Sequence, residues 1–378
     1  MSRRGNVNAV MSTEVWFAPG RANLMGEHTD YNEGFVLPFA LAQGVTATAT
    51  ARDDGQLVLR SKQRQAEPVT LPLDSLAPRS VAGWAAYPAS VAWALRAAGL
   101  DIRGASIDID SDLPVGAGVS SSAALECSVA LALCSLSGAE VGREALAKIA
   151  KRAENEFVGA PTGIIDQSAA LLCQADRAML LDCRTLAATQ VPFQPSAAGA
   201  AALIVDTRVT HALVSGEYAA RRAECEEAAR LLGVPALGLV ADPAAVERLA
   251  DPVLRRRARH VVTDSLRARA IAAALQDAST PDSYPFIGKL LTEGHASLRD
   301  DFEVSWPQAD AAVAVAAEAG AYGAKMIGGG FGGSVLALVP AERVTRVYAA
   351  LTASFVERGW APPEFLEAVP APAARRLA

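Results

Sequence analysis

The sequence has 378 residues, of which 51% are hydrophobic and 20% are charged. This composition supplies enough apolar side chains for a large core and excludes a mainly disordered chain. The 35 basic and 41 acidic residues give a net charge of −6. That balance argues against a nucleic acid or an anionic membrane as partner, because both call for a basic surface.

The length predicts two domains, since single hydrophobic cores stop growing near ~250–300 residues. Segment 192–200 contains prolines and almost no charge, which is typical of a soft domain boundary. We therefore expect one domain over 11–198 and a second over 199–378. Residues 1–10 are expected to form a disordered tail, and they lack the apolar segment of a signal peptide.

The cysteines are odd in number and scattered, at positions 127, 134, 173, 183 and 225, without a CxxC pair. This pattern favours reduced thiols and a cytoplasmic protein over a disulfide framework or a zinc site. The sequence also lacks an apolar run of about 18 residues, so no membrane-spanning helix is expected.

The hydrophobic patterns predict strands and helices that alternate along the chain. In the first half, strands are expected at 35–41, 44–51, 56–60, 105–110 and 178–181, and helices at 84–95, 121–136, 143–157 and 164–172. Residues 61–80 contain three prolines and are expected to be irregular. In the second half, strands are expected at 203–206 and 334–339, and helices at 217–232, 243–276, 285–298 and 308–319.

The first candidate site is the segment 18–41, with the sequence APGRANLMGEHTDYNEGFVLPFAL. Glycines at 20, 26 and 34 allow backbone conformations that bring its polar side chains together. Carboxylates, one cation and close backbone approach are what a small polyhydroxylated ligand requires. The alternative is a polar surface turn that leads into a strand.

The second candidate site is the segment 114–123, PVGAGVSSSA, between a predicted strand and an apolar helix. The first turn of such a helix presents free N–H groups and the positive end of the helix dipole. Glycines and serines there suit the phosphates of a nucleotide, although an ordinary helix N-cap has the same residues. It is not a Walker loop, because the sole Gly-Lys pair, at 288–289, lacks that motif.

The third glycine-rich segment is GGGFGG at 328–333, which formally satisfies the dinucleotide fingerprint GxGxxG. A dinucleotide loop follows a strand and opens a helix. Here we expect a helix before the glycines and a strand after them, so a dinucleotide site is rejected. The glycines instead predict a close approach to another loop or to the ligand.

Two acidic residues complete the candidate chemistry. Asp166 lies in the apolar sequence GIIDQ and is expected to be largely buried, which is uncommon unless a carboxylate is paired or functional. The alternative for Asp166 is a helix N-cap. Glu154 lies on a predicted helix and is either a solvated surface residue or, beside the phosphate loop, a magnesium ligand.

In this order, GRANLMGEHTDYN, PVGAGVSSSA and GGGFGG resemble the three signatures of the galacto-, homoserine-, mevalonate- and phosphomevalonate-kinase (GHMP) superfamily. EHTDYN, GIIDQ at 163–167, GEYAARRAECE at 216–226 and SLRDDFEVS at 297–305 resemble the galactokinase family specifically. The resemblance implies an α+β fold of two domains with mixed sheets and helices, and an active site in the interdomain cleft. It also implies ATP-dependent phosphorylation of the anomeric hydroxyl of α-D-galactose, with Mg2+. We expect a monomer.

The same resemblance implies roles for individual residues. Asp166 takes the position of the catalytic aspartate, and Arg21 that of the arginine which steadies the aspartate and the transferred phosphoryl group. The substrate-binding positions are Glu27, His28, Thr29, Asp30, Gly163 and Tyr218. The positions of the ATP phosphate loop are Gly116, Ala117, Gly118, Val119, Ser120, Ser121 and Ser122. Ser122 and Glu154 take the magnesium positions.

Three rival interpretations remain open. One is a kinase of the same fold that acts on N-acetylgalactosamine or another sugar. A second is a non-catalytic sensor of galactose and ATP, although such a protein is expected to have lost the phosphate loop or Asp166. A mevalonate- or homoserine-type kinase gives no reason for EHTDYN. Ile327 departs from the galactokinase pattern, which usually has threonine there.

Overall fold

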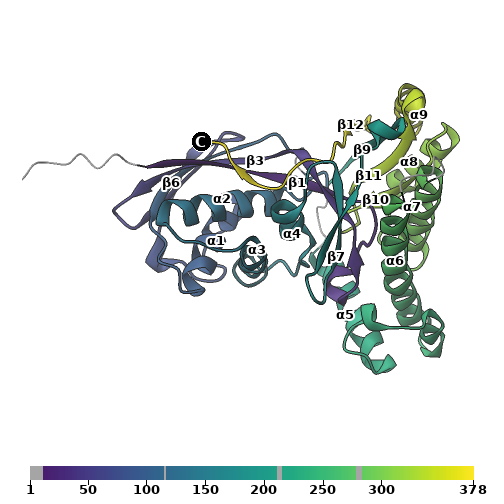
Figure 1. Ribbon diagram of the computed structural model, residues 1–378, viewed down its shortest axis with the longest axis horizontal. Coiled ribbons are helices and arrows are strands. Elements are labelled where there is room, and N and C mark those ends of the chain that lie inside the picture. Colours follow the sequence, from purple (N-terminus) through teal and green to yellow (C-terminus); the bar gives the residue numbers. More distant parts are fainter. Residues whose placement is uncertain (1–11, 115, 211–214, 278–282) are drawn as a thin grey trace, which may run out of the picture.

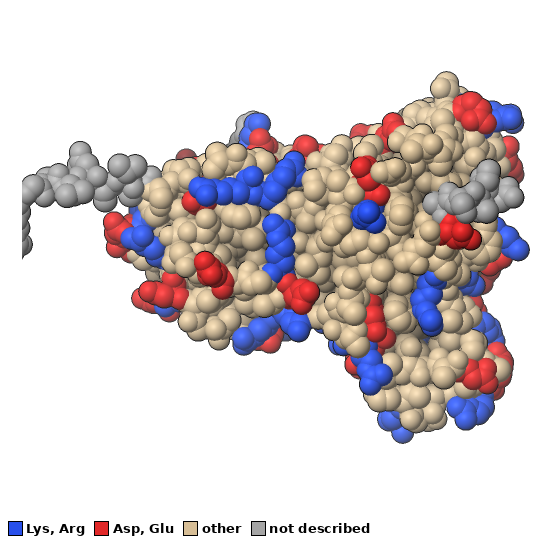
Figure 2. All heavy atoms as spheres, in the orientation of Figure 1, with Lys and Arg blue, Asp and Glu red and all other residues tan. Residues whose placement is uncertain are grey.

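The computed structural model describes residues 12–114, 116–210, 215–277 and 283–378. Figure 1 shows an elongated molecule with two halves, each built from a sheet and the helices that pack against it. The strands β1 and β3 and the chain end marked C lie in the half that contains α1–α4. On the face in Figure 2, acidic and basic side chains are interspersed over both halves.

The first sheet has the strand order β13-β1-β3-β6-β4-β5. Its alternating segment ASIDID is a strand as predicted, with Ala105, Ile107 and Ile109 turned into the core. All neighbours are antiparallel except β4 and β6. The strands are β1 (Thr13–Asn23), β3 (Pro38–Arg52), β4 (Gln56–Ser61), β5 (Arg64–Pro72), β6 (Gly104–Ser111) and β13 (Arg375–Arg376).

Helices α1–α4 pack beside this sheet, and α2 contacts both β1 and β3. The helix α2 is buried along most of its length, as its apolar sequence requires. A π-helical turn, Ala153–Val158, continues α3. The helices are α1 (Ala86–Ala97), α2 (Ser121–Ser137), α3 (Arg143–Arg152) and α4 (Ile165–Leu172).

The second sheet has the order β10-β11-β9-β12, and a small third sheet has the order β2-β7-β8. Helix α6 starts with Pro252 after Asp251, whose carboxylate caps the amides of Val253 and Leu254. The strands are β2 (Phe35–Val36), β7 (Arg177–Asp182), β8 (Ala188–Pro192), β9 (Ala200–Val209), β10 (Gly323–Ile327), β11 (Gly333–Pro340) and β12 (Glu364–Glu367). The helices are α5 (Ser215–Leu232), α6 (Pro252–Gln276), α7 (Ser283–Asp300), α8 (Pro307–Glu318) and α9 (Val344–Glu357).

The buried side chains form two clusters, one mainly in the first half and one in the second. The boundary near residue 199 stays a prediction, and β9 begins at Ala200. The last strand, β13, returns to pair with β1 in the first sheet. Among the described residues, no helix is both long and apolar enough to cross a membrane.

The structure corrects several predicted elements. Residues 61–80 are not irregular throughout, because β5 pairs there with β4. The segments 35–41 and 44–51 are a two-residue strand and one continuous strand, β3. Gly44 does not interrupt β3; a Cβ at this position would overlap the backbone of Ala18 and the ring of Phe17, so the glycine permits close packing of β1 on β3.

Other corrections concern the helices. The predicted helix 243–276 is a short 3₁₀ helix, Pro243–Arg248, followed by α6. The predicted helix 143–157 changes from α-helical to π-helical at Ala153. A strand, β10, and not a helix directly precedes the glycines at 328–333. The dinucleotide site is still rejected, because a strand rather than a helix follows, and the glycines form a β-hairpin loop.

Candidate active site

A pocket of about 560 Å³ lies between elements of the two halves. Four segments form most of its wall: the 24–34 loop after β1, the 112–120 loop with the first turn of α2, the segment 158–166, and the glycine hairpin 328–333. Most of the predicted site residues line it. The lining residues from the predicted site are Arg21, Glu27, His28, Asp30, Gly116, Gly118, Val119, Ser120, Ser121, Ser122, Gly163, Asp166 and Tyr218.

Asp166 and Arg21 form an ion pair within this pocket. The Arg21 Nε lies 2.8 Å from Asp166 Oδ1, and the Arg21 Nη1 donates to the carbonyl oxygen of Gly118 at 2.5 Å. Asp166 is in the first turn of α4, but the N-cap residue is Ile164, so the capping interpretation is wrong. The Asp166 side chain is 19% exposed and faces the pocket, so it is less buried than its apolar neighbours suggested.

The 112–120 loop has the geometry of an anion site. Gly116, Gly118 and the N-cap residue Ser120 all have positive φ angles. The amide of Arg21 donates to the carbonyl oxygen of Val119 at 3.1 Å, which ties the loop to β1. The Ser120 Oγ is buried and has no hydrogen-bond partner among the described residues. The free N–H groups at the start of α2 therefore share the pocket with an unsatisfied hydroxyl.

The Ala117 residue differs from the rest of this loop, because it does not line the pocket. It is fully buried, and its carbonyl oxygen accepts a hydrogen bond from Ser334 Oγ at 2.7 Å. This bond links the 112–120 loop to β11. The glycine hairpin also approaches the loop, since a Cβ on Gly328 would lie 3.3 Å from the Gly118 carbonyl oxygen. The close approach predicted for the glycines at 328–333 is confirmed.

Glu154 is buried next to Ser122, which rules out a solvated surface position. Its Oε2 accepts hydrogen bonds from Thr162 Oγ1 and Gln167 Nε2, both at 2.8 Å, and the Ser122 hydroxyl also donates to its carboxylate. Burial, and after it the charge of Asp166, raises the pKa of Glu154. The Glu154 carboxylate therefore lies beside the Ser122 hydroxyl, and a bound cation would offset the electrostatic cost of keeping the buried carboxylate ionised.

A second carboxylate, Glu126, lies behind Glu154 and was not assigned a function from the sequence. It is a fully buried residue of α2, and Gln167 Nε2 donates to its Oε2 at 3.2 Å. Burial, and after it the nearness of Glu154, raises the pKa of Glu126 well above its ordinary value. The one signal in the sequence was a lone glutamate within an otherwise apolar helix.

The 24–34 loop presents His28 and Asp30 to the pocket. The His28 ring packs on Phe302 and Tyr218, with ring centroids 4.6 Å and 5.3 Å away. Burial, and after it the neighbouring His260, lowers the pKa of His28 to about 3, so the ring is neutral near pH 7. Its Nδ1 contacts the Tyr31 hydroxyl at 3.0 Å, and its Nε2 has no hydrogen-bond partner among the described residues.

Asp30 lies against Gly163, and the two residues depend on each other. A Cβ at Gly163 would overlap the Asp30 carboxylate, so only glycine fits there. The Asp30 Oδ1 accepts from the amide of Tyr31 at 3.0 Å, and Oδ2 from the amide of Ile165 at 3.4 Å. Burial, and after it the charge of Asp166, raises the pKa of Asp30.

Thr29 does not line the pocket, although it belongs to the predicted sugar-binding stretch. It is fully buried, and its hydroxyl lies 2.8 Å from the carbonyl oxygens of both Gly26 and Phe35. Since one hydroxyl has one hydrogen to donate, these two acceptors share it. The structure thus places Thr29 as a support for the turn of the 24–34 loop.

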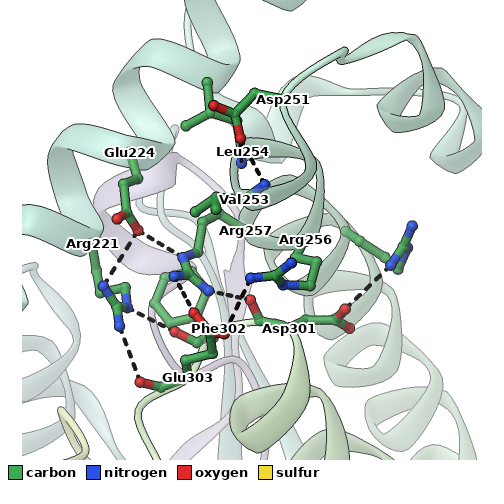
Figure 3. A network of polar contacts seen from close by, with 11 residues as sticks. Arg221, Glu224, Asp251, Val253, Leu254, Arg256, Arg257, Asp301, Phe302 and Glu303 are labelled. Carbon is green, nitrogen blue, oxygen red and sulfur yellow. Dashed lines mark hydrogen bonds and ion pairs between the residues drawn. The ribbon is translucent and has the colours of Figure 1, made fainter.

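A network of charged residues on α5 and α6 holds the loop that carries Phe302, as Figure 3 shows. Arg257 is nearly fully buried and bonds Glu224 Oε2 at 2.6 Å, Glu303 Oε2 at 2.5 Å and the Asp301 carbonyl oxygen at 2.5 Å. Arg221 donates to the carbonyl oxygen of Phe302 at 2.7 Å. The network therefore fixes the ring that packs against His28.

Family models match three parts of the chain. The galactokinase galactose-binding signature matches residues 8–51, the N-terminal domain of GHMP kinases matches 86–174, and the C-terminal domain of GHMP kinases matches 283–357. The galactokinase of Streptomyces coelicolor is 50% identical over 367 residues, which cover 96% of this chain and 94% of that protein. The chain belongs to the galactokinase family of the GHMP kinases.

Other galactokinases also match nearly the full length of the chain. The galactokinase of Mycobacterium tuberculosis is 44% identical, with 96% of this chain and 99% of that protein covered. The crystal structure of Lactococcus lactis galactokinase complexed with galactose superposes with a TM-score of 0.91 at 31% identity, covering 97% of this chain and 95% of that one. The predicted family and the α+β fold of two GHMP-kinase domains are confirmed.

More distant structures share only the fold of the galactokinase family. A mevalonate kinase superposes with a TM-score of 0.65 at 16% identity, covering 96% of this chain and 98% of that one. The homoserine kinase of Cytophaga hutchinsonii superposes with a TM-score of 0.63 at 16% identity, covering 99% of this chain and 100% of that one.

Ile327, the departure from the galactokinase pattern, is fully buried in the core and does not line the pocket.

Proposed function

We propose that the protein transfers the γ-phosphoryl group of ATP to the anomeric hydroxyl of α-D-galactose, giving galactose 1-phosphate. The observation that carries this proposal is the position of the Arg21–Asp166 ion pair. The pair lies in one pocket with the 24–34 loop and with the 112–120 loop. A kinase needs this arrangement, because most of the catalysis of phosphoryl transfer comes from positioning and charge stabilisation.

Galactose occupies the side of the pocket formed by the 24–34 loop. Glu27, His28, Asp30 and Tyr218 all line that side, and Gly163 leaves the room that the Asp30 carboxylate needs. Burial, and after it the charge of Asp30, raises the pKa of Tyr218 well above its ordinary value, so its hydroxyl stays a hydrogen-bond donor. Acceptors and donors in a partly buried pocket suit a sugar with several hydroxyl groups. Galactose is the sugar in the matched Lactococcus lactis complex.

ATP occupies the side formed by the 112–120 loop and the start of α2. Its phosphates accept hydrogen bonds from the first-turn amides and from the hydroxyls of Ser120 and Ser121. Ser122 and Glu154 would hold Mg2+, and their contact with each other fits that role. When bound, Mg2+ neutralises phosphate charge. Two protein ligands suffice, because Mg2+ usually completes its shell with waters and phosphate oxygens.

The chemical step uses Asp166 and Arg21. Asp166 accepts the hydrogen bond of the anomeric hydroxyl and takes its proton as the new O–P bond forms and the bond from the γ-phosphorus to ADP breaks. Arg21 holds the carboxylate through Nε and reaches the 112–120 loop through Nη1. It therefore fixes the distance between the proton acceptor and the phosphate loop, and its charge faces the transferred group.

We also propose the setting in which the enzyme acts. The described cysteines are free, in keeping with a reducing cytoplasm. We propose that the enzyme is a monomer and that its chain divides into domains near residue 199. Measuring the molar mass by light scattering during gel filtration tests the monomer, and a mass of two chains would contradict it.

The experiment that tests the function is an assay of ADP release with galactose, N-acetylgalactosamine, glucose and arabinose at equal concentrations. The proposal predicts the highest kcat/KM for galactose and a requirement for Mg2+. Preference for N-acetylgalactosamine would favour a related sugar kinase. Saturable binding of galactose and ATP without ADP release would favour the sensor.

A further inference from the structure

Lys325 is a fully buried lysine in the middle of β10, an otherwise apolar strand. Its Nζ lies 2.9 Å from Glu27 Oε1 and 3.3 Å from the carbonyl oxygen of Asn23. Both partners belong to the end of β1 and the loop after it, about 300 residues away in the sequence. The contact joins the second sheet to the end of β1 and to the 24–34 loop.

Both bonds that the Glu27 carboxylate makes with described residues end on the same oxygen. The amide of Gly328, in the glycine hairpin, also donates to Glu27 Oε1, at 3.2 Å. Glu27 lines the pocket, whereas Lys325 does not. The Glu27 Oε1 is thus bound by the Lys325 ammonium group and the Gly328 amide. The other oxygen, Oε2, forms no hydrogen bond with the described residues.

Burial of this pair fixes the orientation of the carboxylate. The Lys325 side chain is 0% exposed and the Glu27 side chain is 6% exposed. Removing two charges from water is costly, and only good geometry with further hydrogen bonds compensates for the loss of hydration. The extra bonds to Asn23 and Gly328 supply that geometry. A rotation of Glu27 away from Lys325 would leave a buried ammonium group without its carboxylate partner.

We propose that Lys325 is a positioning residue for sugar recognition. It holds Oε1 of Glu27 so that Oε2 accepts a hydrogen bond from one particular hydroxyl group of the sugar. This inference rests on the proposed function, since it assumes that galactose occupies the pocket. The role differs from a general effect on folding, because it concerns a single hydroxyl group of the substrate.

The test measures KM and kcat for galactose and for the galactose derivatives that each lack one hydroxyl group. Wild type, Lys325→Met and Glu27→Gln are compared, each as the full chain. Lys289→Met is the matched control, because Lys289 is 73% exposed on α7. We expect both site variants to raise the KM for galactose about tenfold or more, since a hydrogen bond to a charged group is lost or misdirected.

The decisive comparison is the pattern across the derivatives. We expect that for one derivative the KM of wild type and of both variants is nearly equal. It should be the same derivative for Lys325→Met and for Glu27→Gln. That derivative lacks the hydroxyl that Glu27 binds. Equal weakening for every derivative, or an effect only on the KM for ATP, would overturn the proposal. The Lys289→Met control is expected to match wild type throughout.

Thermal unfolding shows whether the variants fold. If the unpaired Glu27 charge prevents Lys325→Met from folding, the double variant Lys325→Met with Glu27→Gln removes both charges at once. We expect the double variant to give the same pattern of KM values across the derivatives as Glu27→Gln alone, with no further rise in KM. A KM for galactose far above that of Glu27→Gln alone would mean that Lys325 acts independently of Glu27. Wild type that fails to phosphorylate galactose would contradict the proposed function itself, which separates the two failures.

Discussion

Arg21 and Asp166 form an ion pair with 2.8 Å between Nε and Oδ1, and the same guanidinium group donates to the carbonyl oxygen of Gly118. One side chain thereby connects the proposed proton acceptor with the phosphate loop. A planar group with several donors can hold both partners at once, which a lysine cannot do. The pair is therefore expected to control the chemical step.

The first prediction concerns Asp166. Asp166→Asn keeps the shape of the side chain but removes the charge that accepts the proton, so kcat should fall by about 10²–10⁴-fold. The dissociation constant for ATP should change little, because Asp166 is not on the phosphate loop. Steady-state kinetics and ATP titration by calorimetry measure both. Asp108→Asn, at an exposed position on β6, is the control, and near-normal turnover by Asp166→Asn would contradict the assignment.

The second prediction concerns the magnesium position. Glu154→Gln keeps the hydrogen-bonding shape but removes the charge beside Ser122, so the Mg2+ concentration for half-maximal rate should rise at least about tenfold. Glu156→Gln is a matched control on the same π-helical turn, because Glu156 is 52% exposed. An unchanged Mg2+ requirement in Glu154→Gln would remove Glu154 from the metal site.

The third prediction uses the contact between Gly163 and Asp30. Gly163→Ala introduces a methyl group where the Asp30 carboxylate lies, and overpacking of this kind costs about 1–3 kcal/mol. We expect the KM for galactose to rise about tenfold while the KM for ATP stays near wild type. Gly142→Ala, at the start of α3, has open space around the added group and serves as control. If both variants behave alike, the Asp30 position is not set by Gly163.

The fourth prediction is a pH dependence of stability at His260. Burial lowers the pKa of His260 to about 4 in the folded state, against about 6.5 in an unfolded chain. Between pH 6.5 and pH 4 the unfolded chain therefore binds a proton at His260 that the folded protein does not bind. Protonation then favours unfolding, so the stability that the neutral His260 ring contributes is lost as the pH falls toward 4. From pH 7 to pH 5 the loss is about 2 kcal/mol.

Urea unfolding of wild type and His260→Gln at pH 7 and pH 5 checks this effect. The free-energy difference between the two proteins should shrink at pH 5 by about that 2 kcal/mol, because only wild type loses it. The hydrogen bonds of His260 to Ser297 and to the Glu27 carbonyl oxygen contribute equally at both pH values while the ring stays neutral. A difference that does not change with pH would mean that His260 titrates normally.

The sequence predicted the motifs themselves, because each motif has a local signature, whereas the resemblance to the galactokinase family implied that they meet in one site. The serines before α2 indicated a helix N-terminus, and Asp166 stood out as a charge among apolar residues. Segments with conformational signals of their own, such as ASIDID in β6, were also predicted correctly. What the motifs share is that a few neighbouring residues determine their conformation.

The parts that were missed depend on distant packing. Lys325 lies in a five-residue strand whose sequence, GAKMI, has no alternation, and its partner Glu27 is in the other half of the chain. Similarly, the strand β5 contains two prolines, Pro68 and Pro72, so its sequence predicts an irregular segment although it pairs with β4. Tertiary context outweighs local preference at such positions, so no window of the sequence could reveal them.

The most direct test of the central claim is the phosphorus NMR spectrum of the product formed from galactose, ATP and Mg2+. The account predicts a single sugar phosphate whose phosphorus couples to the anomeric proton, formed in equal amount with ADP. It also predicts that Asp166→Asn yields almost none of this product. A phosphate on another sugar hydroxyl, or wild-type protein that binds galactose and ATP without forming ADP, would contradict it.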